Sequence, residues 1–214
     1  MSRRRKRIIN KARDTYAFVV DGKTEFWYLQ MLKRNERDLA VRIEPRLPSK
    51  KSLADQYKLV KSLAEDYTKV FWIVDYDVIR KETREAKPGT ETSEQQFIRF
   101  RNSLRALGNV FVIVNDPCLE FWLLLHFVTT TRFFGSCSPA ERELGRYMDG
   151  YEKTEKYYTK QDQDIYLRLQ DNLAEAVERA ERMGSYDEYD TERAVCEMDL
   201  LFNDEGIRKV ILEG

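Results

Sequence analysis

The stretch that decides the fold is Val70-Phe-Trp-Ile-Val-Asp-Tyr-Asp77. Its first five residues are apolar without interruption, a pattern typical of a β-strand that is buried on both faces. Such strands occur in parallel sheets that are covered by helices on both sides. We therefore expect an α/β protein in which this strand lies inside the sheet, with Asp75 and Asp77 at the end of the strand.

Strand and helix patterns alternate on both sides of this stretch. Runs of β-forming residues predict further strands over 16–20, 41–47 and 110–114. Apolar residues at helical spacing predict helices over 24–33, 51–67, 93–107 and 118–128, whereas the charged stretch 80–92 is predicted to be a loop. The alternation implies a sheet of about four mainly parallel strands that are joined by right-handed crossovers and flanked by helices.

The β pattern ends near residue 130, and we expect three segments along the chain. Residues 139–148, 163–183 and 191–203 all have the spacing of helices. The predicted segments are a basic N-terminal tail over 1–14, an α/β core over 15–130, and a helical extension over 131–214 that packs on the core.

The charges balance over the whole chain but not along it. Lys and Arg number 37, as do Asp and Glu, so no net charge attracts the protein to nucleic acid. Residues 1–13, however, contain seven basic residues and no acid. This segment is interpreted either as a phosphate-binding arm or as a solubilising terminus, and the sequence leaves both interpretations open.

The cysteines and the hydropathy bear on the cellular setting. Cys118, Cys137 and Cys196 are too few and too scattered to predict a disulfide framework or a zinc site, and they indicate a reducing compartment. No apolar run is long enough to cross a membrane, and no apolar signal core follows the basic start. We expect a soluble, cytoplasmic protein that does not bind a membrane.

Acidic residues follow three of the predicted strands at the points where they end. These residues are Asp21, Asp75, Asp77 and Asp116. The carboxyl ends of parallel strands meet at one edge of a sheet, where open α/β sheets bind their ligands. Glu25 lies one helical turn after Asp21 and is expected to face the same place. Asp75 and Asp77, two residues apart in an extended segment, are expected to project to one side.

Several carboxylates in one place are costly unless a cation neutralises them. Oxygen ligands suit Mg²⁺, with Mn²⁺ as a substitute, so we predict a metal site with the ligands Asp21, Glu25, Asp75 and Asp77. Paired ions would stabilise the attacking and leaving oxygens of a phosphodiester displacement. The alternative for Asp21-Gly22 is ordinary turn chemistry, and for Asp75 and Asp77 it is solvated carboxylates that cap a helix.

Other polar residues are candidates for the lining of this site. His126, the single histidine, lies on the apolar 118–128 helix, where a hydrogen-bonded core histidine is the default. Glu120 on the same helix needs a partner or a metal because it lies among apolar residues. Lys23 lies in the turn after the first strand and could contact phosphate. Asp116 could assist metal binding, although a helix cap is the simpler role.

A tyrosine-rich segment over 151–158 holds further lysines. Lys153, Lys156 and Lys160 could contact phosphate while the tyrosines stack on bases. The simpler interpretation is an ordinary helix surface whose tyrosines pack inward. Lys153 is kept as a catalytic candidate that would stabilise developing negative charge.

The motifs resemble a known family. A strand that ends in Asp21-Gly-Lys-Thr-Glu25 and an apolar strand that ends in Asp75-Tyr-Asp77 resemble the Toprim domain. The closer resemblance is to RloB-like proteins, through Phe18–Glu25, Asp116–Phe127 and Tyr151–Tyr157. This resemblance extends from about residue 8 to about residue 185.

The resemblance implies a Rossmann-like core and Mg²⁺-dependent phosphodiester chemistry in phage defence or restriction-modification loci, often beside an ATPase partner. Related Toprim nucleases use four acids that correspond to Asp21, Glu25, Asp75 and Asp77, and the resemblance also supports a role for Lys153. The sequence departs from the family at Asp21, where Glu is usual, and at Asp116, where Asn is more common. No Gly-x-x-x-x-Gly-Lys loop is present, so an ATPase would be a separate chain.

Three functions follow as hypotheses. The first is a Mg²⁺-dependent nuclease that cuts DNA or RNA, including tRNA, in defence against phage. The second is a catalytically weak module that binds nucleic acid or an ATPase partner, because Asp21 is one methylene shorter than the usual Glu. The third is another phosphoryl or nucleotidyl transferase on the same scaffold. The sequence does not determine the oligomeric state, and a dimer is one option.

Overall fold

A computed structural model describes residues 14–39, 41–49 and 52–213 of the chain. The basic segment 1–13 and its expected contact with phosphate lie outside the described residues. None of the helices in the described ranges is long and apolar enough to cross a membrane.

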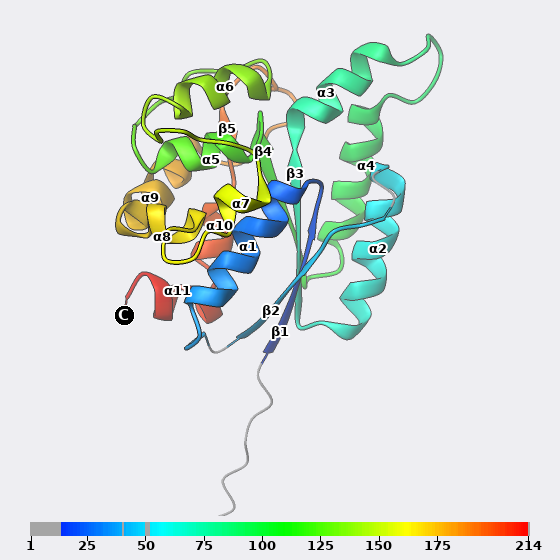
Figure 1. The fold of residues 1–214 in the computed structure, drawn as a ribbon. Helices are drawn as coiled ribbons and strands as arrows, with labels where there is room; N and C mark the ends of the chain where they lie inside the picture. Colours follow the sequence, from blue (N-terminus) through cyan, green and yellow to red (C-terminus); the bar gives the residue numbers. More distant parts are fainter. Residues whose placement is uncertain (1–13, 40, 50–51, 214) are drawn as a thin grey trace, which may run out of the picture.

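The described strands form one sheet at the centre of the molecule (Figure 1). Its spatial order is β2-β1-β3-β4-β5. The strands are β1 (Asp14–Val20), β2 (Val41–Arg46), β3 (Lys69–Asp75), β4 (Val110–Asp116) and β5 (Val195–Cys196). The first four are mutually parallel, and β5 pairs antiparallel with β4. The expected α/β fold with about four mainly parallel strands is therefore confirmed.

Helices cover both faces of this sheet (Figure 1). One layer contains α2 (Leu53–Asp66), α3 (Tyr76–Glu85) and α4 (Ser93–Arg105). The opposite layer contains α1 (Lys23–Asn35), α5 (Leu119–Leu125), α6 (Cys137–Leu144), α7 (Glu155–Tyr158), α8 (Ile165–Leu169), the 3₁₀ turn Gln170–Asn172, α9 (Leu173–Met183), α10 (Asp199–Phe202) and α11 (Glu205–Ile211). The arrangement is that of a Rossmann-like core.

Strand β3 supplies side chains to the hydrophobic cores on both faces. Phe71 and Ile73 belong to the core beneath α1 and α5, whereas Trp72 and Val74 belong to the core beneath α2 and α4. Successive side chains of a strand point to opposite faces, so a strand between two helical layers must be apolar at every position. The continuous apolar run in the sequence follows from this central position.

Several predicted elements differ from the structure. Residues 80–85 continue α3 rather than forming a loop, because Tyr76 and Ile79 are buried and the charged side chains occupy its outer face. Residues 191–203 are not one helix, since they include β5 and the short α10. The expectation that no strand follows residue 130 is wrong, because β5 lies at Val195–Cys196. The sequence did not predict this strand, since two residues are too few to show a β pattern.

Candidate functional site

The predicted acids converge at the carboxyl edge of the sheet, which faces upward in Figure 1. Asp21 follows β1, and Glu25 lies in the first turn of α1. Asp75 is the last residue of β3, and Asp77 lies in the first turn of α3. Glu120 joins them from the first turn of α5, which follows β4. Three adjacent parallel strands therefore bring five carboxylates to one edge.

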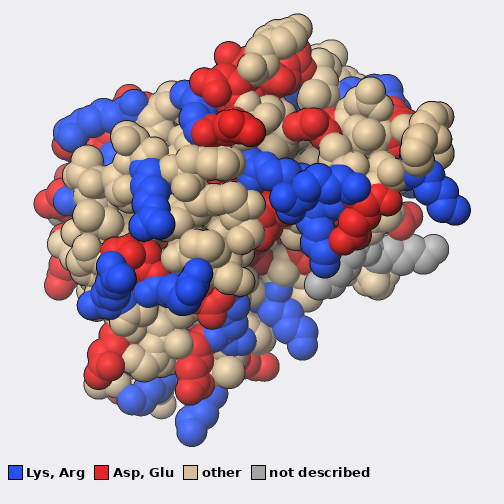
Figure 2. Space-filling model, turned by 90° about the horizontal axis from the view of Figure 1, so that it is seen from above, with Lys and Arg blue, Asp and Glu red and all other residues tan. Residues whose placement is uncertain are grey.

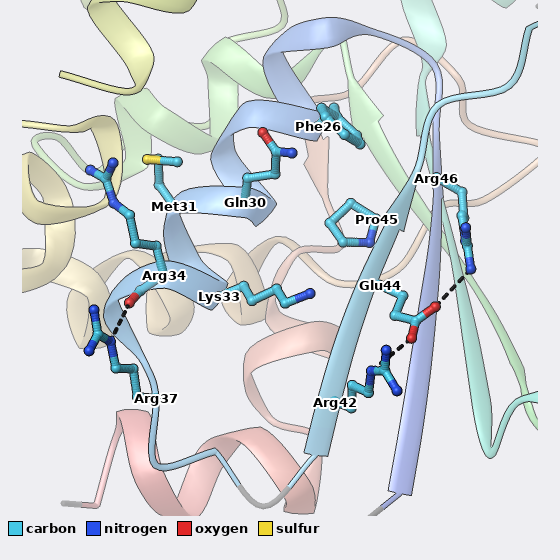
Figure 3. Close-up of a pocket in the computed structure, with 10 residues that line it drawn as sticks. All are labelled: Phe26, Gln30, Met31, Lys33, Arg34, Arg37, Arg42, Glu44, Pro45 and Arg46. Atoms are coloured by element: carbon cyan, nitrogen blue, oxygen red, sulfur yellow. Dashed lines mark hydrogen bonds and ion pairs between the residues drawn. The ribbon is translucent and has the colours of Figure 1, made fainter. Parts of the chain in front are cut away.

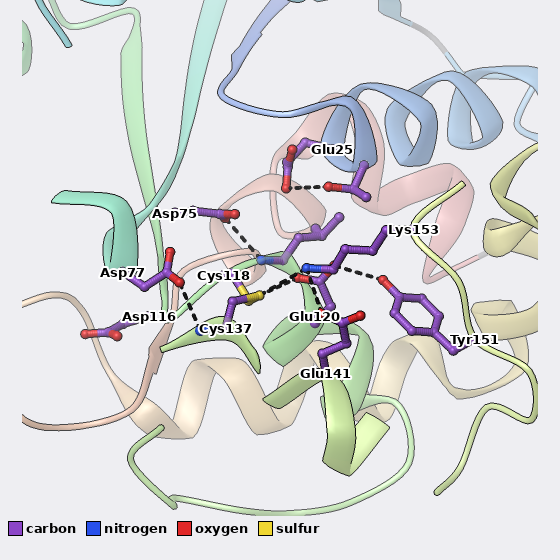
Figure 4. Close-up of a disulfide and its surroundings, with 12 residues drawn as sticks. Glu25, Asp75, Asp77, Asp116, Cys118, Glu120, Cys137, Glu141, Tyr151 and Lys153 are labelled. Carbon is purple, nitrogen blue, oxygen red and sulfur yellow. Dashed lines mark hydrogen bonds and ion pairs between the residues drawn. A yellow bond between two sulfur atoms is a disulfide. The ribbon is translucent and has the colours of Figure 1, made fainter. Parts of the chain in front are cut away.

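Main-chain amides hold the two acids of the Asp75-Tyr-Asp77 motif. The amide of Leu119 donates to Asp75 Oδ1 at 3.1 Å, and the amide of Cys137 donates to Asp77 Oδ2 at 2.9 Å. Asp77 is helical rather than extended, so the predicted alternation along a strand is wrong for this pair. Nearness of the two carboxylates instead depends on the turn from β3 into α3 (Figure 4).

Gln56 of α2 positions the Asp21 carboxylate. The sequence did not predict this role for Gln56. Its Nε2 donates to Asp21 Oδ1 at 3.1 Å, while its Oε1 accepts from Trp72 Nε1 at 2.8 Å. Gln56 is only 2% exposed, so both ends of this amide are fixed within the protein. Asp21 and Asp75 line the same small cavity beside Gln56. A lone glutamine within an amphipathic helix carries no sequence signal for this role.

The Glu25 side chain is buried, and one of its two carboxylate oxygens accepts no hydrogen bond from the described residues. Thr24 Oγ1 donates to Glu25 Oε1 at 3.1 Å, but Glu25 Oε2 has no hydrogen-bond partner among the described residues. A Cβ at Gly22 would lie 2.4 Å from Glu25 Oε2, so a side chain at this position would displace the carboxylate. The Asp21-Gly22 turn thus makes room for Glu25 at the site.

The carboxylates strongly perturb one another. Burial raises the pKa of Asp75 well above its ordinary value, and the neighbouring Glu25 and Glu120 raise it further. Burial also raises the pKa of Glu25 to about 7, with repulsion from Glu120 and Asp21 adding to the effect. Both shifts mean that these groups resist ionisation unless positive charge is supplied.

The charge of Glu120 has a partner in the protein (Figure 4). Lys153 Nζ lies 3.0 Å from Glu120 Oε1 and 3.2 Å from Glu141 Oε2. Tyr151 donates to Glu120 Oε1 at 2.8 Å. Burial lowers the pKa of Lys153, but attraction by Glu120 outweighs it, and the net pKa lies above the ordinary value. The expectation that Glu120 needs a partner is thereby met by Lys153.

Cys118 and Cys137 form a disulfide, a pairing that the sequence did not predict and that disagrees with the reducing compartment expected from the cysteines. Cys118 precedes α5 and Cys137 begins α6, and the chain between them folds back so that the two helices pack together. The spacing of the two cysteines in the sequence did not predict that they lie within bonding distance. Cys196 is free and buried in β5.

Asp116 and Lys23 lie near the acids of the site, but Asp116 is paired with Arg80 and Lys23 is exposed. Asp116 forms a two-point ion pair with Arg80, through hydrogen bonds at 3.2 and 2.5 Å. It does not cap α5, whose N-cap is Cys118, so the predicted cap is wrong. Burial raises the pKa of Asp116 to about 6 despite the opposing effect of Arg80. Lys23 is exposed at the first position of α1.

His126 lies at the far end of α5 from Glu120. Its Nδ1 lies 3.1 Å from the carbonyl oxygen of Trp122, and its ring packs edge-on against the Trp122 ring. The side chain is buried, and burial lowers its pKa to about 4. These contacts are those of a hydrogen-bonded core histidine, which was the default interpretation.

The chemistry of these residues suits a divalent cation. In the described part of the chain, however, the group whose ligand atoms all lie within 4.8 Å of one another is Cys118, Glu120 and Cys137, and not the predicted set of acids. Glu25, Asp75 and Asp77 offer hard oxygen donors, which Mg²⁺ prefers, and Glu25 Oε2 is a buried acceptor without a described partner. The raised pKa values of Glu25 and Asp75 indicate a place where positive charge is needed. Part of this positive charge is supplied by the protein itself, because Lys153 forms ion pairs with Glu120 and Glu141.

The molecular surface at this edge carries both signs of charge (Figure 2). Blue and red side chains alternate across the face, and neither sign covers it. Attraction of a polyanion to this face would therefore depend on particular groups of basic residues rather than on a uniform field.

Comparison with known proteins identifies the family. No match was found among curated proteins or among solved structures. The model of one family, described as RloB-like protein, matches residues 16–204. This range contains all five carboxylates of the site, together with Lys153 and the disulfide. Because the match covers most of the chain, the protein belongs to the RloB-like family.

Proposed function

We propose that the protein is a Mg²⁺-dependent nuclease of the Toprim type, which hydrolyses phosphodiester bonds of DNA or RNA. The observation that carries the proposal is the buried Glu25 carboxylate beside Asp75, with a pKa raised to about 7 and one oxygen without a described partner. Such a group resists ionisation and stays protonated near neutral pH unless a cation stabilises its charged form.

Asp21, Glu25, Asp75 and Asp77 are the proposed ligands. When bound, Mg²⁺ or Mn²⁺ would supply positive charge to the reacting phosphate and a nucleophilic water. The amides of Leu119 and Cys137 orient Asp75 and Asp77, and Gln56 orients Asp21. These contacts hold the carboxylates in place before any substrate arrives.

Two lysines are proposed to act on the substrate. Lys153 is anchored by Glu120 and Glu141, so its charge stays beside the carboxylates, where it would stabilise negative charge that develops on phosphate. Lys23 is exposed next to Asp21 and would contact a neighbouring phosphate. Asp116 and His126 have structural partners and receive no catalytic role in this proposal.

The family membership supports a protein of a defence locus. We propose that the nuclease acts against phage, with tRNA among its candidate substrates, and that an ATPase partner controls it. A dimer is compatible with this scheme.

A second function is favoured by one observation. Asp21 is shorter than the Glu that is usual in the family, and Gln56 already occupies one of its oxygens. If this change displaced the metal ion, cleavage would be slow. The protein would then act as a module that binds nucleic acid or the ATPase without efficient cleavage.

The deciding experiment is a cleavage assay on labelled DNA and RNA with Mg²⁺, Mn²⁺ or EDTA. Asp75→Asn should remove both metal-dependent cleavage and Mn²⁺ binding, measured by calorimetry, while the fold is retained. Asp66→Asn, the same change at an exposed position at the end of α2, is the matched control. Cleavage by Asp75→Asn at the wild-type rate would refute the nuclease assignment. Wild-type binding of nucleic acid without cleavage, in the presence of the ATPase, would favour the binding module.

A further inference from the structure

A groove lies between α1 and the outer strand β2 (Figure 3). Its volume is about 860 Å³, and half of the residues that line it are basic. The cations are Lys33, Arg34, Arg37, Arg42 and Arg46, whereas Glu44 is the carboxylate in the lining. Because the whole chain has no net charge, this excess is a local property of the groove.

The cations of the groove are only partly neutralised by the protein. Arg34 is paired with the buried Asp164 at 2.5 Å, and Arg42 and Arg46 share the single carboxylate of Glu44, at 2.9 and 2.7 Å. Lys33 and Arg37 are exposed and form no ion pair with any residue in the described ranges. The groove therefore offers positive charge that a polyanion can use.

The groove begins next to the carboxylate site. Phe26, at its upper end, directly follows Glu25 in α1. Arg46 is paired in register with Val19, two residues before Asp21. A second hollow of about 490 Å³, which has three basic residues and one acid, Glu36, in its lining, shares Lys33, Arg37 and Arg42 with the groove and extends it along β2 to Thr15. Together they form a basic path that leads away from the acids.

We propose that this path binds the sugar-phosphate backbone of a single strand of nucleic acid and directs it to the carboxylate site. The destination of the strand rests on the proposed nuclease function, but the binding itself does not. Cations in the lining would contact phosphates, and the partly exposed ring of Phe26 offers a surface on which a base can stack. Aromatic and basic side chains in one groove are typical of single-strand binding.

A peptide strand is a less suitable occupant of the same place. An outer strand such as β2 can pair with another β-strand through its unpaired amides and carbonyls. Pro45 in β2 has no amide hydrogen, so it interrupts such pairing. Arg46 directly after Pro45 and Arg42 three residues before it also favour phosphate over an uncharged backbone.

The test measures binding apart from cleavage. Labelled single-stranded DNA and RNA oligonucleotides are titrated in EDTA by fluorescence anisotropy, with matched duplexes for comparison. The variant Lys33→Glu/Arg37→Glu changes two exposed groove residues. Its control, Lys58→Glu/Lys61→Glu, makes the same change in net charge on α2, on the opposite face of the sheet.

We expect the groove variant to bind the single strand at least roughly tenfold more weakly, and the control to bind like wild type. The slope of log K against log salt should fall by about 0.7 for each phosphate contact removed. Thermal unfolding by circular dichroism checks the fold of both variants. If the double variant does not fold, Lys33→Glu alone is used, with Lys58→Glu as its control.

The outcomes separate the groove from the nuclease function. Equal binding by wild type and the groove variant, or equal weakening by the groove variant and its control, would overturn the groove proposal. Tighter binding of duplex than of single strand would also overturn it. If wild type does not cleave but the groove variant still loses binding, the nuclease proposal fails and the groove proposal stands. If Asp75→Asn loses cleavage and keeps binding in EDTA, both stand.

Discussion

Cys118 and Cys137 are joined by a disulfide that connects the two chain segments holding the acids of the Asp75-Tyr-Asp77 motif. The residue after Cys118 donates its amide to Asp75, and the amide of Cys137 itself donates to Asp77. The bond therefore restrains the separation of two hydrogen-bond donors that belong to different helices. We therefore expect the disulfide to stabilise the fold and to restrain the positions of Asp75 and Asp77.

Reduction of this disulfide should destabilise the protein by about 3 kcal/mol, because the bond closes a loop of intermediate length in the unfolded chain. The sequence separation between its cysteines is 19 residues. Urea unfolding, followed by circular dichroism with and without a dithiol reductant, measures the difference. The reductant opens the bond by becoming a disulfide itself and leaves two thiols on the protein.

The double variant Cys118→Ser/Cys137→Ser is the control for this measurement. Its free energy of unfolding should be near that of the reduced wild type and should not respond to the dithiol. Cys196 is retained in both proteins, so any effect of reductant on that buried thiol appears equally in each. Equal unfolding curves for oxidised and reduced wild type would show that the bond does not stabilise the fold.

Glu25 should make the metal-free protein less stable as the pH rises from about 4.5 to about 7. Its pKa is about 7 in the folded protein and 4.5 ordinarily, so in this window the folded state holds a proton that the unfolded state has lost. Stability therefore falls with rising pH, by about 3 kcal/mol from this group across the window. Added Mg²⁺ should restore stability above pH 7, because it binds the folded state alone.

Glu25→Gln isolates this contribution, since the amide does not titrate. Without metal, the variant should become more stable than wild type as the pH rises through the same window. At pH 8, Mg²⁺ should raise the melting temperature of wild type and leave that of Glu25→Gln nearly unchanged. A variant that is stabilised by Mg²⁺ as much as wild type would exclude Glu25 as a ligand.

The sequence predicted the elements that place the site because these elements have strong local signals. Strand β3 is apolar at each position between its helical layers, and a strand of this kind is readily recognised. The positions of Asp21, Glu25 and Asp75 follow from strand ends and from one helical turn, which are local features of the chain. Their common location then follows from the parallel sheet.

The missed features depend on contacts between distant parts of the chain. Gln56 contacts Asp21 across 35 residues, and Arg80 contacts Asp116 across 36. Strand β5 exists because Val195 and Cys196 pair with the end of β4, more than 75 residues earlier. The Cys118–Cys137 bond likewise depends on how α6 folds back on α5. No periodicity within the sequence reports such contacts.

His126 should titrate with a pKa of about 4, well below its ordinary value of 6.5. Burial disfavours the charged ring, so between these values the unfolded chain binds a proton that the folded protein does not. Stability should therefore fall as the pH drops from about 6.5 to about 4, by about 3 kcal/mol from this group. Because the chain has one histidine, its ring resonances in an NMR titration report this pKa directly.

His126→Gln should have a flatter dependence of stability on pH between about 4 and 6.5 than wild type. The amide can still donate to the carbonyl oxygen of Trp122, so the main structural contact has a replacement. A measured pKa near 6.5 in the folded protein would show that the ring is hydrated, contrary to its burial among the residues of α5.

Lys153 and Glu120 should show strong coupling in a double-mutant cycle. Lys153→Met leaves the buried Glu120 with the Tyr151 hydroxyl but without its counter-charge, so we expect a loss of about 2 kcal/mol. This value is set below that of a fully buried pair because the Lys153 side chain is 36% exposed and partly screened by solvent. Lys153→Met/Glu120→Gln should be less destabilised than the sum of its single variants, by at least about 1 kcal/mol.

The same cycle separates the structural role of Lys153 from the proposed catalytic role. Lys153→Arg keeps the charge and should retain most of the stability, whereas the neutral double variant should fold and yet cleave poorly. Urea unfolding measures the first property and the cleavage assay measures the second. A stable neutral double variant that cleaves at the wild-type rate would assign Lys153 to the neutralisation of Glu120 alone, and the developing negative charge would then have to be stabilised by another group at the edge of the sheet.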